Sequence, residues 1–424
     1  MKKVNLKNIS KEDYQPLLKR PAIDNEKVFG IVQPILSEIK NEGMNAIIKF
    51  AKEYDELKDS DLRVKQKDID EAEQSIDSDL KQAIKSAIAN ITKFHEVQFP
   101  KDYEIETMKG VKCGRVYRAI ENVGLYIPGG TASLFSTLLM LAIPAKITGC
   151  KRIVVCSPKP SNEVLYCSQV LGIDEVYDLG GAQAIGFMAY GTEEVKKVDK
   201  VFGPGNQFVT AAKSLVSIDP DGCAIDMPAG PSEVIIIADE NANPKYAAAD
   251  LLSQAEHGID SQVILISTSQ KIIDEVELEV IKQLEKLPRK EIAEKALEKS
   301  LLLKCDSIEN AISFSNNYAP EHLILQIENA NSFLKQVQNA GSVFLGNYTP
   351  ESAGDYASGT NHSLPTYGFA KTFSGVNLLS FMKGITYQSL SKEGIINIGK
   401  TVIDMANAEG LKAHANAVEV RLND

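Results

Sequence analysis

The sequence contains no tryptophan, only five histidines and no excess of positive charge among its 424 residues. Its formal net charge of -11 at pH 7 argues against a nucleic-acid groove or an anionic membrane surface as the main partner. The most apolar stretch, from Leu134 to Ala145, is too short to cross a bilayer core of about 30 Å. The first residues include lysines but lack the apolar core of a secretory signal. We therefore expect a cytoplasmic protein.

Cysteine is also scarce. The six cysteines form no CxxC pair and lie mostly within apolar or strand-like runs. A cytosolic protein usually keeps such thiols reduced and buried as small hydrophobic side chains. We therefore expect neither disulfide bonds nor cysteine metal ligands.

The chain alternates between helical and strand-like patterns. Residues 26–55 and 68–96 have helical apolar spacing. From Asn122, short apolar strands end at glycines and alternate with helical patterns, and a second such series begins at Ser232. This alternation is typical of βαβ units and parallel sheets, in which ligands bind beyond the carboxyl ends of the strands.

The length predicts two to three domains. We predict an α/β fold with two Rossmann-like doubly wound domains, mostly parallel sheets, and small helical segments at both ends. The expected units are an N-terminal arm (1–25), one α/β domain (26–120 with 233–378), a second α/β domain (121–232) and a C-terminal helical tail (379–424). The tail is too small to form a core alone, so we expect it to dock on another domain or another subunit.

Four of the five histidines lie in dense runs of polar and small residues that are far apart in the sequence: His257, His322, His362 and His414. Histidine serves both as a metal ligand and as a proton carrier near neutral pH, so this placement suggests one assembled site. His95 lacks such surroundings and looks incidental.

A candidate metal-binding pair lies near the end of a predicted helix. Asn243 and Pro244 are suited to the start of this helix, and Gly258 is suited to its end. Gln254 and His257 are three residues apart, so they share one helix face. The alternative is that the histidine caps the carbonyl end of the helix and the glutamine is a surface amide.

Two further residues complete a potential ligand set. Asp355 follows two small residues in an expected loop, and a carboxylate buried there needs a partner. His414 lies in the expected C-terminal helix, where a bulky imidazole is an unusual choice for packing among small residues. With Gln254 and His257 they form a set of two nitrogen and two oxygen donors that suits zinc, with Mn²⁺ or Co²⁺ as alternatives.

Eight runs occur in one order along the chain: GLYIPGG, LGGAQAIG, GPGNQF, DMPAGPSE, SQAEHGIDSQ, NYAPEHL, AGDYASGTNHSLPT and AEGLKAHANAVEVR. Together they closely resemble the histidinol dehydrogenase family. The resemblance implies an NAD-dependent enzyme that oxidises L-histidinol through L-histidinal to L-histidine, the last steps of histidine biosynthesis, and reduces two NAD.

The resemblance also implies one zinc ion per subunit, bound by Gln254, His257, Asp355 and His414. It implies a homodimer in which His414 comes from the partner chain. This arrangement agrees with a tail that is too small to stand alone.

The resemblance assigns Glu321 and His322 as the acid/base pair. Imidazole suits removal of the hydroxyl proton during hydride transfer, and a carboxylate suffices to activate water for the aldehyde step. Consecutive strand residues face opposite ways, so both can reach one site only if Pro320 places them at a turn or helix start. The alternative is that the histidine begins a strand, half-buried, and the glutamate is solvated.

Substrate contacts implied by the resemblance include the four metal ligands and His322, together with Ser232, His362 and Glu409. The alternatives for the last three are a turn serine, a loop histidine and a glutamate in the first turn of a helix.

The usual dinucleotide fingerprint is missing, because no GxGxxG motif follows a strand with an acidic residue about 20 positions later. Three strand-end loops with glycines remain, and these could admit a pyrophosphate. The family positions imply NAD contacts from Tyr126, Gln183 and Asn206 in these loops, which assigns NAD to residues 121–232. Each of the three could also be an ordinary turn residue.

Other functions remain open from the residues alone. They are a zinc hydrolase, an oxidoreductase for another polar alcohol, and a catalytically idle metal-binding protein.

Overall fold

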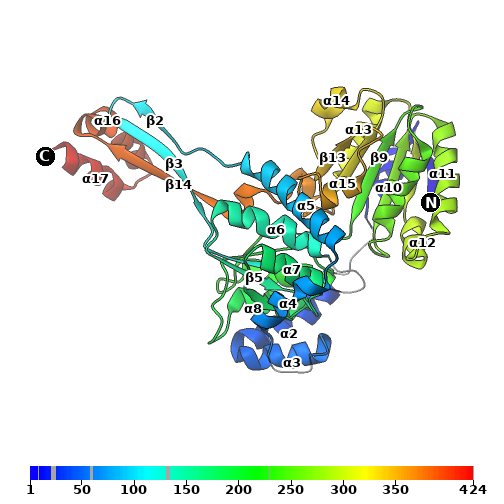
Figure 1. Cartoon of the computed structure of the whole chain (residues 1–424). Coiled ribbons are helices and arrows are strands. Elements are labelled where there is room, and N and C mark those ends of the chain that lie inside the picture. The colour runs from blue at the N-terminus through cyan, green and yellow to red at the C-terminus, as the bar shows by residue number, and fades with distance from the viewer. Residues whose placement is uncertain (8, 21–24, 58–60, 130–133, 229, 424) are drawn as a thin grey trace.

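The computed structural model describes the whole chain except residues 8, 21–24, 58–60, 130–133, 229 and 424. The described residues form two parallel sheets covered by helices and a third, antiparallel sheet that extends as an arm toward the C-terminus (Figure 1). The predicted α/β fold with two mostly parallel sheets is confirmed. The antiparallel arm was not predicted.

The first parallel sheet has six strands. In spatial order they are β1 (Lys2–Asn5), β11 (Leu301–Lys304), β10 (Gln262–Ser267), β9 (Glu233–Ala238), β12 (His322–Gln326) and β13 (Ser342–Leu345). Strands β9, β10 and β12 are buried along their whole length, as expected for a parallel sheet with both faces covered. Because β1 pairs with β11, Lys2–Asn5 form an edge strand of this sheet, whereas the sequence predicted a separate N-terminal arm over residues 1–25.

Alternate residues of these strands pack against different helices. One face packs on α10 (Pro244–Ala255), α11 (Gln270–Leu284) and α12 (Lys290–Glu298). The other face packs on α1 (Lys11–Leu17), α13 (Ile308–Tyr318) and α14 (Ala330–Phe333). A short helix, α15 (Glu351–Tyr356), follows β13 and lies against α10.

The second parallel sheet has five strands. In spatial order they are β6 (Glu175–Tyr177), β5 (Arg152–Cys156), β4 (Asn122–Tyr126), β7 (Lys200–Phe202) and β8 (Ala224–Ile225). One face packs on α4 (Gln66–Glu71), α5 (Ser78–Glu96), α6 (Phe135–Thr148) and α7 (Asn162–Val170). The other packs on α2 (Asn25–Glu42), α3 (Met44–Tyr54), α8 (Gly181–Tyr190) and α9 (Gln207–Ile218).

The helices of residues 25–96 therefore cover the five-stranded sheet. This packing differs from the predicted grouping of 26–120 with 233–378. Helical periodicity shows that one face of a helix is buried, but it does not show which sheet buries it. Short 3-10 helices span Ala72–Ser75, Leu334–Gln336, Phe369–Lys371 and Leu378–Phe381.

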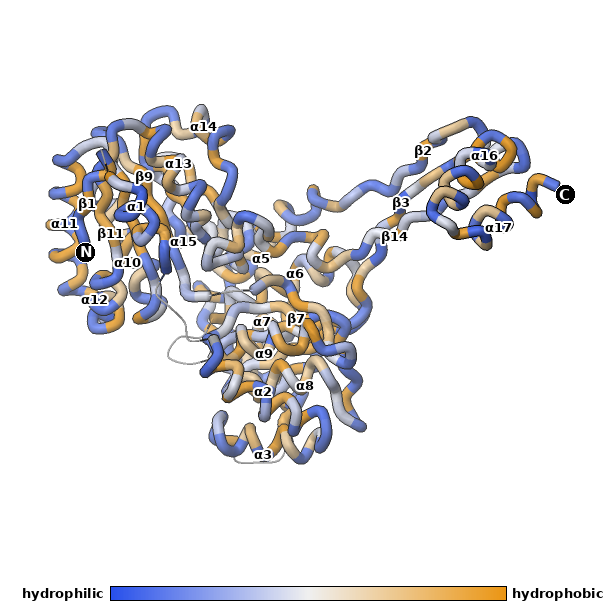
Figure 2. The backbone as a smooth tube through the Cα atoms, turned by 180° about the vertical axis from the view of Figure 1, so that it is seen from behind, coloured by the Kyte–Doolittle hydropathy of each residue, from blue (hydrophilic) through white to orange (hydrophobic). Residues whose placement is uncertain are grey.

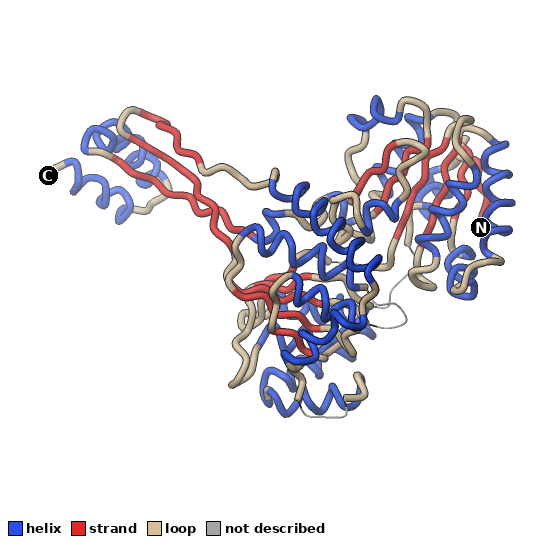
Figure 3. The backbone as a smooth tube through the Cα atoms, viewed as in Figure 1, coloured by secondary structure: helices blue, strands red, loops and turns tan. Residues whose placement is uncertain are grey.

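The arm consists of three antiparallel strands that carry two helices at the tip. The strands, in spatial order, are β14 (Met382–Leu390), β3 (Val111–Ala119) and β2 (Tyr103–Met108), and the helices are α16 (Lys392–Ala408) and α17 (Lys412–Leu422). Figure 3 shows the strands of the arm running away from both parallel sheets. The predicted helical tail thus begins with a strand, whose mostly exposed residues lack the alternation that marks a half-buried strand.

The tip of the arm carries apolar residues that its own chain does not cover. Figure 2 shows hydrophobic positions along α16 and α17. Ile396 is 59% exposed, Met405 62% and Val420 47%.

All six cysteines are free thiols, as predicted. No helix in the described part of the chain combines the length and hydropathy needed to cross a membrane.

Candidate active site

The end of α10 places two of the predicted ligands together. The helix starts as predicted, with the Asn243 side chain accepting a hydrogen bond from the Lys245 amide (3.0 Å) and Pro244 in the first turn. It ends at Ala255, slightly earlier than predicted. A hydrogen bond from the His257 amide to the Gln254 carbonyl (3.3 Å) continues the turn and keeps these two residues close.

Asp355 lies in the short helix α15, where a loop was predicted. The close backbone approach predicted for its small neighbours is confirmed at Gly354. A Cβ atom at this position would lie only 2.7 Å from Cε1 of Phe344. Glycine therefore lets α15 pack tightly against β13.

Helix α15 also supplies a residue that the sequence reasoning missed. Ligand atoms of His257, Glu351 and Asp355 all lie within 4.8 Å of one another, so these three residues could hold a metal ion. Glu351 precedes Asp355 by four residues, which places both carboxylates on one helix face. The spacing of four residues between Glu351 and Asp355, directly after Pro350, is typical of one helix face. From the sequence we predict a loop there and therefore do not single out Glu351.

Glu321 and His322 face the same cluster because a turn precedes β12. Ala319 has a left-handed backbone (φ 56°) at the end of α13, and the strand begins only at His322. The Nε2 atom of His322 lies 3.6 Å from the Asp355 carboxylate, and its Nδ1 atom lies 3.6 Å from the Glu321 carboxylate. The predicted turn at Pro320 is thus present, and the alternative of a solvated glutamate is wrong.

Backbone and side-chain donors fix the Glu321 carboxylate. Its Oε2 atom accepts hydrogen bonds from the Glu233 amide (2.9 Å) and from Nε2 of Gln254 (3.3 Å). Both Glu321 and Gln254 are buried. These contacts link the acid/base pair to the glutamine of the predicted ligand set.

The cluster lies at the amino ends of β9 and β12. Ser232 precedes β9 directly, as Glu321 precedes β12, and α10 brings its carboxyl end to the same edge. The rule that ligands bind beyond the carboxyl ends of parallel strands does not predict this location.

The electrostatics of the cluster are governed by buried charge. Burial raises the pKa of Glu321 to about 7 and also raises the pKa of Glu351. Burial opposes protonation of His322, but Glu351, Glu321 and Asp355 together raise its pKa to about 10. Burial also disfavours ionisation of Asp355, yet the nearby His322 lowers its pKa. The charge on the imidazole of His322 therefore depends on three neighbouring carboxyl groups, those of Glu351, Glu321 and Asp355.

Three buried polar atoms of the cluster have no hydrogen-bond partner among the described residues. They are Nε2 of His322 and both carboxylate oxygens of Glu351. Buried polar atoms are normally paired, so these residues are suited to bind a cationic or polar group. The donor set of histidine, glutamine and carboxylates is suited to a divalent metal ion.

His362 joins the cluster to the other half of the molecule. Its Nδ1 atom lies 2.8 Å from the Asp355 carbonyl, and its Nε2 atom lies 3.1 Å from Oγ1 of Thr137 in α6. The cluster therefore lies where the helices of the two sheets meet. His95 is buried outside this cluster, with its Nδ1 atom 2.8 Å from the Ile91 carbonyl.

The two predicted residues of the C-terminal tail are not in this cluster within one chain. Glu409 follows α16 as its C-cap residue and His414 lies in α17, and both are exposed. Figure 1 places these helices at the end of the molecule opposite the six-stranded sheet.

The predicted NAD-contacting residues line one cavity of about 730 Å³ beside the five-stranded sheet. Tyr126 ends β4, Gln183 lies in the first turn of α8, and Asn206 precedes α9. The cavity thus lies at the carboxyl ends of the strands, as the parallel-sheet rule predicts. Each residue also has a structural partner; for example, Asn206 accepts hydrogen bonds from the Phe208 and Val209 amides.

Asp55 is a second residue that the sequence reasoning missed. It follows α3 and lines the same cavity. Its carboxylate accepts hydrogen bonds from Nε2 of Gln183 (2.8 Å) and from the Gly180 amide (3.1 Å). Its distance from Gln183 in sequence left no local signal.

A cavity at the carboxyl ends of one parallel sheet and a buried cluster of histidine and carboxylates at the edge of the other are features of an α/β enzyme. The family model for histidinol dehydrogenase matches residues 18–422. The chain therefore belongs to the histidinol dehydrogenase family.

Individual members of the family match this chain over nearly its full length. The chain is 50% identical to a histidinol dehydrogenase of Vibrio parahaemolyticus, covering 100% of this chain and 98% of that protein. It is 53% identical to one of Campylobacter jejuni, covering 98% and 97%. The crystal structure of histidinol dehydrogenase from Elizabethkingia anophelis superposes with a TM-score of 0.96 at 50% identity, covering 100% of this chain and 98% of that one.

Proposed function

We propose that the protein oxidises L-histidinol through L-histidinal to L-histidine and reduces two NAD, as the last steps of histidine biosynthesis. The observation that carries this proposal is the buried Glu321 and His322 pair facing a cluster of potential metal ligands. Family membership over nearly the whole chain supports the same reaction.

Zinc is the proposed metal, one ion per subunit, held by Gln254, His257 and Asp355 and by His414 of the partner subunit. Support comes from the donor atoms gathered around His257 and Asp355 and from the unpaired buried atoms beside them. When bound, such an ion acts as a Lewis acid and as an anchor for substrate nitrogen and oxygen atoms.

The acid/base pair divides the proton transfers of the two oxidations. A bound cation would offset the carboxylates that raise the pKa of His322, so that His322 takes the hydroxyl proton as hydride leaves the alcohol carbon. Glu321 takes a proton from the water that adds to the aldehyde. The amide of Gln254 holds Glu321 toward this site. Ser232, His362 and the partner's Glu409 are the further substrate contacts.

NAD is proposed to bind in the cavity lined by Tyr126, Gln183 and Asn206. Its volume and its place at the carboxyl ends of the strands support a dinucleotide. Asp55 supports this role of Gln183 by holding its side-chain amide.

A homodimer is proposed because the tail residues need a second subunit to reach a site. Glu409 and His414 lie on the arm, far from the cluster of their own chain (Figure 1). The uncovered apolar residues at the tip give the arm a surface that a partner can bury.

The test is formation of NADH when the purified protein is given L-histidinol, NAD and Zn²⁺. We expect two NADH per histidinol and histidine as the product. Chelation of the metal should abolish NADH formation, and added Zn²⁺ should restore it. Absence of NADH with histidinol under metal-replete conditions would refute the proposal.

A further inference from the structure

Arg20 forms a buried ion pair beside the candidate active site, although it lies in the segment before α2. Its Nε atom lies 2.8 Å from Oε1 of Glu233, and its Nη2 atom lies 3.0 Å from Oε2 of the same residue. The exposed fractions of the two side chains are 10% and 2%. Breaking such a pair by removing one partner leaves a buried charge uncompensated.

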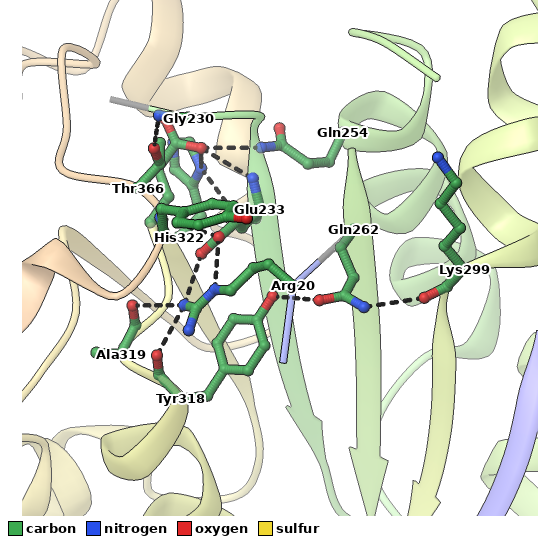
Figure 4. Close-up of polar contacts among 12 residues, drawn as sticks. Arg20, Gly230, Glu233, Gln254, Gln262, Lys299, Tyr318, Ala319, His322 and Thr366 are labelled. Carbon is green, nitrogen blue, oxygen red and sulfur yellow. Dashed lines mark hydrogen bonds and ion pairs between the residues drawn. The ribbon is translucent and has the colours of Figure 1, made fainter. Parts of the chain in front are cut away.

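The same guanidinium holds the turn that precedes the acid/base pair. Nη2 donates hydrogen bonds to the carbonyls of Tyr318 (2.7 Å) and Ala319 (3.1 Å), as Figure 4 shows. The guanidinium also lies 3.6 Å from the centre of the Tyr318 ring. Ala319 has the left-handed backbone (φ 56°), which a residue with a Cβ atom adopts only when its surroundings hold it there.

Glu233, the other partner of Arg20, is in direct contact with the pair through its backbone. Its amide donates to the Glu321 carboxylate (2.9 Å), and its carbonyl oxygen lies 3.3 Å from Nδ1 of His322. Its side chain also accepts a hydrogen bond from the Tyr367 amide (3.0 Å). Arg20 thus ties the turn before the pair to the strand that contacts the pair.

From this geometry we propose that Arg20 is a positioning residue for the oxidation of histidinol. It orients Glu321 and His322 through Glu233 and the turn at Tyr318 and Ala319. This inference rests on the proposed function. The role requires the planar fork of arginine, because a lysine ammonium cannot bind one carboxylate through two parallel hydrogen bonds and two carbonyls at once.

The experiment compares Arg20→Lys with the wild-type holoenzyme. The variant keeps the positive charge, so it should fold and retain its metal. We expect kcat for histidinol to fall by about 10- to 100-fold, because small displacements of catalytic groups cost rates of this size. KM for histidinol and for NAD should change by less than about threefold, because the contacts proposed to bind them remain.

A second variant tests rescue. Arg20→Ala should lose more of kcat, and added guanidinium ion at millimolar concentration should restore part of it. A purely stabilising role would give no recovery of kcat in the fraction that is already folded.

The chain offers a matched control in Arg152→Lys. Arg152 forms an ion pair of the same geometry with Glu175, with distances of 2.7 Å and 2.6 Å, at the edge of the five-stranded sheet away from the cluster. We expect its kcat to stay within about twofold of the wild-type value.

Three results would overturn the positioning role. They are a wild-type kcat in Arg20→Lys, a loss of activity that only follows the folded fraction, and an equal loss of kcat in Arg152→Lys. A wild-type enzyme that does not oxidise histidinol would instead refute the proposed function, and the positioning role with it.

Discussion

At the scale of single residues, the candidate site separates two kinds of carboxylate. Glu321 is buried and receives two hydrogen bonds on one oxygen, whereas the oxygens of Glu351 have no hydrogen-bond partner within the described ranges and only a longer contact of 3.9 Å to Nδ1 of His322. The first is held in place beside His322. The second is one of the three residues whose ligand atoms could hold a metal ion.

Substitution of the acid/base pair should separate the two half-reactions. His322→Asn should lower kcat for histidinol by about 10²- to 10⁴-fold, the usual contribution of a general base, with much smaller effects on substrate binding. Glu321→Gln should slow oxidation of supplied histidinal more than oxidation of histidinol. Single-turnover NADH formation with each substrate measures both effects. Normal oxidation of histidinal by Glu321→Gln would contradict its role in water activation.

The contact between Asp55 and Gln183 predicts an effect on the cofactor alone. Asp55→Ala removes the acceptor of the Gln183 amide, and such a charged hydrogen bond contributes about 1.5–3 kcal/mol. We expect KM for NAD to rise by about 10-fold or more, with KM for histidinol unchanged. Glu53→Ala is the control, because Glu53 is exposed near the end of α3, two residues before Asp55, and is not among the residues that line the cavity. Similar NAD kinetics in both variants would contradict the prediction.

At the scale of secondary structure, packing at α15 places Asp355, a proposed metal ligand. Gly354→Ala would place a methyl group 2.7 Å from the Phe344 ring, which forces α15 away from β13. Overpacking of this kind costs about 1–3 kcal/mol. We expect a lower melting temperature together with weaker zinc retention, measured by metal content after dialysis. Ala353→Gly changes the neighbouring small residue without adding a clash and is the control; equal zinc loss in both would count against this packing effect.

Local patterns predicted most elements because their information is local. After Glu233, strand β9 is a run of buried apolar residues, and α10 begins with an Asn-Pro signal, so both could be predicted from sequence. Strand β2 alternates apolar and acidic residues from Tyr103 to Glu106, but it is short and exposed along its whole length, so no buried face accompanies this pattern. The proposed metal ligands could be predicted from their residue types and from the family resemblance, whereas Glu351 and Asp55 depend on packing between distant segments.

At the scale of the whole molecule, the arm separates the tail from the rest of its own chain. The hydrophobic cores of the two parallel sheets include no described residue of α16 or α17. The tail therefore adds nothing to those cores and is available to another subunit. If a site is shared between subunits, two variants that are each inactive alone can complement each other in a mixed dimer. A site within one chain does not allow this complementation.

Co-expression of His322→Asn with His414→Ala tests this sharing directly. Each variant alone should be inactive. If the tail acts on the partner subunit, a mixed dimer has one site with both defects and one intact site. Random pairing of equal amounts then gives about one quarter of the wild-type activity, measured as NADH formation. Co-expression of His322→Asn with Gln254→Ala is the control, because both defects lie on the same side of every site and no intact site can form. Equal activity in the two mixtures would mean that His414 acts within its own chain or outside the site.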